Sequence, residues 1–344
     1  MTSADGVLVI IICSLTAYAL LAGADFGGGA WDLLARGRHA KGERRLISHA
    51  LGPVWEANHV WLIFVIVATF SGFPSAFGLI ARSLELPLAF ALAGIVLRGA
   101  AYVYRAYGEG AAGPEQWWGR VFAVASTITP FMLGVCGASL ATGKLRADPA
   151  SSPLAPFQSA FTLVSGAFAV VVTAFLAAVY LCRDAAGSPD TVDLVPGFRR
   201  KALGAAVAAG VLSLALLPLL NRDAPVVAHR FADRSLPFLA LAVLCGTVSL
   251  VVIWRQRYGL ARITAALAVG SVLWGWAVAQ YPDLAVGAAT ASGAAAGGAN
   301  MRALLIAMGF GMAVILPAFA LLLKVFATPE PASGRPAATV AAVE

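Results

Sequence analysis

Nine long apolar segments, separated by short polar loops, constrain this chain more than any other feature. They cover residues 6–34, 50–71, 76–104, 118–141, 158–182, 200–220, 235–255, 259–281 and 301–325. Each has about the 20 residues that a helix needs to cross a hydrocarbon core of roughly 30 Å. Only 12% of the 344 residues are charged, about half the share in soluble domains. The sequence therefore predicts an all-α polytopic membrane protein with nine transmembrane helices.

The basic residues indicate how these helices are oriented. They gather in the first, fifth and seventh loops, at Arg36, Arg38, Lys41, Arg44, Arg45, Arg199, Arg200, Lys201, Arg255, Arg257 and Arg262. Loops rich in Lys and Arg stay in the cytoplasm, so we predict that the N-terminus is outside and the C-terminus inside. This asymmetry also accounts for the net charge of +7 without a nucleic-acid partner.

The remaining segments suggest a simple domain organisation. Residues 1–327 are expected to form a single transmembrane domain, and residues 328–344, which are rich in proline, a disordered cytoplasmic tail. Residues 284–299 are mostly Ala and Gly and are expected to be unstructured. The start, Met1 to Gly6, lacks a basic region, so we expect the first segment to remain in the product.

The first two segments carry acids at matching depth. Asp25 lies about ten residues from the cytoplasmic end of the first, and Glu56 about seven residues into the second. At 1.5 Å per residue, the two carboxylates would lie within about two helical turns of each other. Ionisable groups inside a membrane usually mark a proton, ion or substrate path. The alternatives are that Glu56 and His59, which share a helix face, touch water at a helix mouth, and that Asp25 only caps or kinks its helix.

Arg98 in the third segment also has two interpretations. It is seven residues from Arg105 and could extend its side chain to the cytoplasmic surface. It could equally be the counter-ion of Asp25 or Glu56 within the membrane.

The histidines argue against haem binding by this chain. His59 is the only one well inside a predicted span, whereas b-type haems take axial His or Met ligands from helices. No Walker motif, nucleophile elbow or metal-ligand cluster occurs in the sequence. We therefore expect no catalytic residue, metal or cofactor in this chain alone, so that any redox chemistry belongs to another subunit.

Three stretches resemble subunit II of cytochrome bd-type quinol oxidases. Residues 24–29 (ADFGGG), with Gly27 and Gly29, resemble the family's GFDxGxG stretch. Residues 52–62 (GPVWEANHVWL), with Pro53, Trp55 and Trp61, resemble its GPxWDGNxVWL stretch. Residues 97–105 (LRGAAYVYR) resemble its FRGxAFEFR stretch. The resemblance covers essentially the whole chain in number and orientation of segments, and the second match is the most specific.

The sequence departs from the family pattern at its acids. Ala22 and Val103 stand where the family often has an acid, and Glu56 replaces the usual Asp. These losses put in doubt any proton route through the missing acids and concentrate the case on Asp25 and Glu56.

The resemblance implies a fold of two four-helix bundles plus one helix in a bacterial cell membrane. It implies a haem-bearing partner, subunit I, with two haems b and one haem d, which oxidises ubiquinol or menaquinol and reduces oxygen to water. This chain would stabilise that partner and would contact membrane lipids. The resemblance is also compatible with a small accessory subunit in the complex. The chain would also provide a cytoplasmic proton path, for which the candidates are Glu56, Asp25, His59, Asn58 and Arg98.

Two other functions fit the same buried charges. A proton-coupled transporter would couple the acids to a solute, although the inverted repeats common in transporters are not evident. A purely structural scaffold would use the charges only to pair with its partner.

Overall fold

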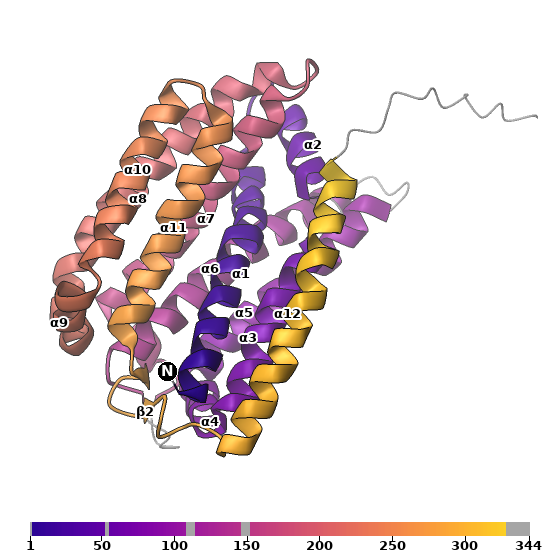
Figure 1. The fold of residues 1–344 in the computed structure, drawn as a ribbon. Helices are drawn as coiled ribbons and strands as arrows, with labels where there is room; N and C mark the ends of the chain where they lie inside the picture. Colours follow the sequence, from indigo (N-terminus) through magenta and orange to yellow (C-terminus); the bar gives the residue numbers. More distant parts are fainter. Residues whose placement is uncertain (1, 52–54, 108–113, 146–151, 328–344) are drawn as a thin grey trace, which may run out of the picture.

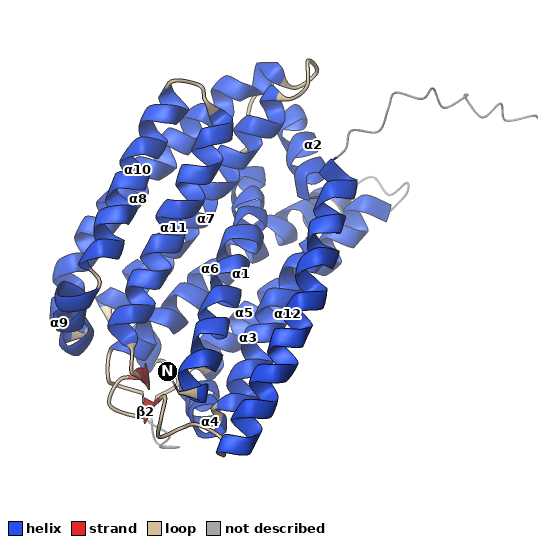
Figure 2. Ribbon diagram, in the orientation of Figure 1, coloured by secondary structure: helices blue, strands red, loops and turns tan. Residues whose placement is uncertain are grey.

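The computed structural model of the chain describes residues 2–51, 55–107, 114–145 and 152–327. Within these ranges the chain is almost entirely helical (Figures 1 and 2). The long helices are α1 (Ser3–Leu34), α3 (Trp55–Gly72), α5 (Glu85–Tyr107), α6 (Pro114–Ala141), α7 (Ala160–Ala186), α8 (Val195–Asp223), α10 (Leu236–Trp254), α11 (Tyr258–Gln280) and α12 (Gly298–Ala327). The short elements are the helices α2 (Ala40–Leu51), α4 (Pro74–Ser83) and α9 (Pro225–Arg234), the 3₁₀ turns η1 (Ala155–Phe157) and η2 (Val192–Leu194), and the strands β1 (Asp283–Ala285) and β2 (Ala289–Thr290).

The predicted all-α membrane architecture is confirmed. Eight helices of the described ranges are each long and apolar enough to cross a membrane, and the bent pair α3 and α4 makes up to nine. The predicted third segment, 76–104, is wrong in its extent, because it is divided between α4 and α5. Pro74 opens α4 after Gly72 and Phe73, and the chain turns by 119° there. Proline lacks the amide proton that a continuous helix would need at this point.

The helices form two groups joined by α1 (Figure 1). The helices α7, α8, α10 and α11 contact one another around one apolar core. The first helix contacts α3, α6 and α7, while α6 contacts α5, and α12 lies against α1 and α3. Thr2 and Asp5 begin α1 with a capping box, in which each side chain accepts a hydrogen bond from the other's backbone amide.

The first basic loop contains a helix, α2, that the apolar pattern does not predict as a separate element. Its buried residues Glu43, Leu46 and Ile47 follow the helical spacing of three and four, and the lysine and arginines around them are exposed. Leu46 and Ile47 pack in a core with Phe198 of α8. An amphipathic helix of this kind lies against the bundle rather than crossing the membrane. We call this side of the molecule the α2 end and the opposite side the α9 end.

The expectation that residues 284–299 lack structure is wrong. The strands β1 and β2 pair in antiparallel fashion there, and Ala285 is fully buried. The amide of Val286 donates to the carbonyl of Leu140, and that of Ala296 to the carbonyl of Gly72. Its small side chains allow this segment to pack closely across the α9 end of the bundle. Its hydrogen bonds join backbone groups and therefore need no particular side chain.

Candidate functional site

The site begins with a contact between α1 and α3. Asn58 donates a hydrogen bond from Nδ2 to Oδ2 of Asp25, with 2.5 Å between the two atoms. Asn58 is only 3% exposed, and the carboxylate of Asp25 is partly buried. This hydrogen bond joins α1 to α3, which pack against each other. The contact supplies a polar partner for a carboxylate placed in an apolar span.

Arg98 of α5 is the cation whose charge acts on this carboxylate. Its side chain is 2% exposed, so it does not extend to the membrane surface. The guanidinium carbon lies 4.8 Å from the ring centroid of Phe26 and 5.4 Å from that of Phe122. The charges of Arg98 and Asp25 interact. Of the two interpretations of Arg98, the structure thus supports that of an internal counter-ion to Asp25.

Aromatic rings enclose the same region. His59 lies with its ring centroid 5.9 Å from that of Tyr18 and 6.2 Å from that of Phe26. Tyr18 is 4% exposed. Trp61, also buried, makes an edge contact with Phe319 of α12 at 5.9 Å between centroids. These rings hold α1, α3 and α12 together around the polar side chains.

Two of the motif glycines allow α1 to approach its neighbours. A Cβ atom at Gly27 would overlap the backbone of Thr173 on α7, and one at Gly29 would overlap the side chain of Ser126 on α6. The close approach therefore requires glycine at both positions. It places Ser126 beside α1, between the depth of Asp25 and the α2 end.

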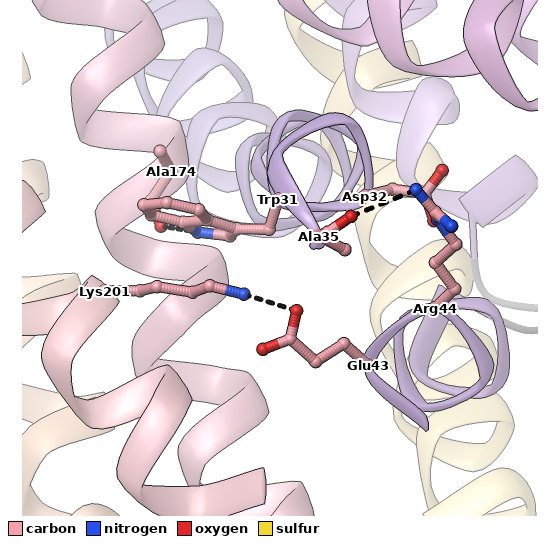
Figure 3. A network of polar contacts seen from close by, with 7 residues as sticks. All are labelled: Trp31, Asp32, Ala35, Glu43, Arg44, Ala174 and Lys201. Atoms are coloured by element: carbon pink, nitrogen blue, oxygen red, sulfur yellow. Dashed lines mark hydrogen bonds and ion pairs between the residues drawn. The ribbon is translucent and has the colours of Figure 1, made fainter. Parts of the chain in front are cut away.

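A second polar network lies at the α2 end (Figure 3). The indole of Trp31 donates to the carbonyl of Ala174, at 2.7 Å. The Lys201 ammonium lies 2.8 Å from a Glu43 carboxylate oxygen and 5.6 Å from the Trp31 ring centroid. This network ties α1, α2, α7 and α8 together.

Asp32 is the buried acid of that network. It is 3% exposed, and Nε of Arg44 lies 3.7 Å from its Oδ1. Arg44 also donates to the carbonyl of Ala35, at 3.1 Å. Asp32 follows Asp25 by seven residues, so the two acids share one face of α1 about two turns, or roughly 10 Å, apart.

The structure thus gathers Asp25, Asn58, His59 and Arg98 in one region. Trp55 and Glu56 belong to the first turn of α3, but their side chains lie outside the described residues, as does Pro53. The sequence analysis missed Asp32 and Glu43 as candidates. The spacing of seven from Asp25 would have found Asp32, whereas Glu43 needed the fold of α2.

The site is an ionic and hydrogen-bonded cluster inside a bundle of membrane helices. This is the class of protein in which buried charges serve a proton or ion path, or the pairing of subunits. Comparison with known proteins identifies the family. Residues 5–326 match the model of cytochrome bd terminal oxidase subunit II, and the chain belongs to that family.

Named relatives agree with this assignment. The chain is 25% identical over 274 residues, or 77% of each protein, to cytochrome bd ubiquinol oxidase subunit 2 of Bacillus subtilis. It is 30% identical over 132 residues to cytochrome bd-I ubiquinol oxidase subunit 2 of Escherichia coli, a match that covers 38% of this chain and 33% of the relative.

A solved structure has the same fold. The bd oxidase from Geobacillus thermodenitrificans matches with a TM-score of 0.76 over 94% of this chain and 98% of the other, at 22% identity. The chain is therefore a multi-pass membrane subunit of a respiratory terminal oxidase, as the three sequence motifs predicted. The transporter hypothesis loses its basis.

Proposed function

We propose that this chain is the second subunit of a quinol:oxygen oxidoreductase, and that it carries protons from the cytoplasm toward the oxygen-reducing centre of its partner. The chain would also stabilise that partner, subunit I. The observation that carries the proposal is the partly buried Asp25 carboxylate, which accepts a hydrogen bond from Asn58 and interacts with the charge of Arg98.

The arrangement suits proton transfer for a physical reason. A carboxylate in an apolar span is costly, and the hydrogen bond from Asn58 and the charge of Arg98 reduce that cost. Glu56 precedes Asn58 and His59 by two and three residues in the sequence, and a spacing of three is that of residues on one helix face. Proton exchange would then pass between Glu56 and Asp25, with Asn58 and His59 as hydrogen-bonding relays.

The α2 end is the proposed cytoplasmic side. It carries α2 and the basic starts of α8 and α11, as the positive-inside rule requires. Protons taken up there and quinol protons released on the opposite side would generate a membrane potential. Asp32 and Ser126 lie between that surface and Asp25, in the position that a path would need.

Haems b and d would be held by the partner, which would supply the electron transfer and the oxygen chemistry. In this chain His59 packs against the rings of Tyr18 and Phe26. In this proposal the residues of the cluster would hold or move protons, and the partner would supply the haem ligands.

A scaffold role is the second candidate, because the opposite charges of Arg98 on α5 and Asp25 on α1 attract each other within the bundle. The test that separates the two is Glu56→Gln in the purified complex. Proton delivery predicts that quinol-driven oxygen consumption falls at least about 10-fold while the haem spectrum is unchanged.

Glu85→Gln, an exposed acid at the start of α5, is the matched control and should retain full turnover. Normal turnover of the Glu56 variant would refute the proton role. Loss of the haem-bearing partner from the purified variant would favour the scaffold.

A further inference from the structure

An apolar groove with a cationic end runs along α11. It has a volume of about 750 Å³ and is flanked by α1, α7 and α10. Figure 1 shows these helices around α11. The lining of the groove on α11 extends from Arg262 to Trp274. Trp274 follows Arg262 by twelve residues, which corresponds to about 18 Å of helix, close to the depth of one leaflet of a bilayer with a hydrocarbon core of about 30 Å.

Two arginines form the cationic end, at the α2 end of the bundle. Arg183 comes from the last turn of α7 and Arg262 from the first turns of α11. The Arg262 guanidinium carbon lies 4.6 Å from the ring centroid of Tyr180, and this stacking fixes its direction. Asp184 interacts with both arginines, and His49 faces Asp184. Arg183, Arg262 and Asp184 together carry a net charge of +1 at the mouth of the groove when His49 is neutral.

The rest of the groove is apolar. Phe238 of α10 and Trp274 of α11 line its far part, and Ile263 and Leu267 are 57% and 50% exposed along it. Gly270 leaves the middle open, since its nearest neighbour to an added Cβ would be Thr16 Cγ2, at 3.8 Å.

We propose that this groove binds one anionic phospholipid. Its phosphate would pair with Arg183 and Arg262, and an acyl chain would lie along α11 toward Trp274. Charge complementarity selects this occupant, because a neutral quinone would leave the arginine charge unmatched and a free anion would gain nothing from the apolar length. The proposal goes beyond the oxidase role and does not depend on any proton path.

The test uses the complex of both subunits, delipidated in detergent and titrated with phosphatidylglycerol or phosphatidylcholine under native mass spectrometry. Each arginine near an anionic headgroup contributes roughly a five-fold factor in affinity. The variant Arg183→Gln/Arg262→Gln should therefore bind phosphatidylglycerol about 25-fold more weakly. The control Arg255→Gln/Arg257→Gln removes the same charge from exposed positions at the same end and should bind as the native complex does.

A second variant tests the apolar part without changing charge. Gly270→Leu should fill the groove and abolish the tight phosphatidylglycerol site, while Arg183→Lys/Arg262→Lys should retain it. The proposal is overturned if both lipids bind equally, if the glutamine variants bind phosphatidylglycerol normally, if added quinone displaces it, or if inorganic phosphate competes with it at equal concentration.

Discussion

Asn58 and Asp25 are 33 residues apart in the chain, yet their side chains meet at 2.5 Å inside the bundle. Asn58 belongs to α3 and Asp25 to α1, so this hydrogen bond joins the two helices of the first transmembrane hairpin. Because both side chains lie in an apolar span, each supplies the polar partner that the membrane does not.

Asp25→Asn keeps the size of the side chain and its bond to Asn58 but removes the exchangeable carboxylate. We expect quinol-driven oxygen consumption to fall at least about 10-fold, because a positioned proton-transferring group typically contributes 10²-fold or more. Haem content should stay constant. Asp233→Asn, an exposed acid of α9, is the control, and equal turnover of the two variants would contradict the prediction.

Arg98→Met should destabilise the protein by roughly 3–5 kcal/mol, since it leaves the Asp25 charge buried without its counter-ion. The double variant Arg98→Met/Asp25→Asn removes both charges and should recover much of that loss. The midpoint of thermal unfolding of the purified complex measures both. A double variant no more stable than Arg98→Met would show that the two charges do not act as a pair.

Gly27→Ala should lower stability by about 1–3 kcal/mol or more, because the added methyl group meets the backbone of Thr173, which cannot rotate away. Gly23→Ala is the matched control, since its added Cβ would lie 3.5 Å from Thr173 Cγ2, an ordinary contact. Thermal unfolding and the yield of assembled complex should separate the two variants. If both glycine variants unfold at the native temperature, α1 and α7 are not in close contact at Gly27 and Thr173.

Lys201→Met should cost about 1–3 kcal/mol. It leaves Glu43 buried without the ammonium group 2.8 Å away, although the Lys201 side chain is 18% exposed and solvent weakens the pair. Adding Glu43→Gln should restore part of the loss. Lys41 is an exposed residue of the same helix as Glu43, so Lys41→Met should unfold at the native temperature. If Lys41→Met lowers the unfolding temperature as much as Lys201→Met does, loss of the Glu43–Lys201 pair is not the cause.

The sequence predicted most of the fold because the membrane makes length and polarity decisive. Apolar runs such as 118–141 and 235–255 have to be helices, since backbone groups in lipid need partners within their own segment. It also predicted that Asp25 lies at the depth of Glu56 in the second segment, whereas the contact of Asp25 with Asn58 came from the structure. The motif of residues 52–62 carried enough specificity to indicate the family.

Other features depended on tertiary contacts. The bend of 119° between α3 and α4 and the packed segment after α11 follow from tertiary contacts at the α9 end. The Ala and Gly residues of that segment carry no periodic signal in the sequence. Glu43 appeared in the sequence as one acid in a basic loop, and only the docking of α2 beside Lys201 buried it.

Sequence by itself determined that the chain crosses a membrane repeatedly, which residues are ionisable within it, and the family to which it belongs. Only the tertiary structure decided that Arg98 turns inward between Phe26 and Phe122 and that Asp32 is a second buried acid on α1. The physical reason is that hydrophobicity acts on each segment alone, whereas the partner of a buried charge is set by helices distant in sequence that pack around it.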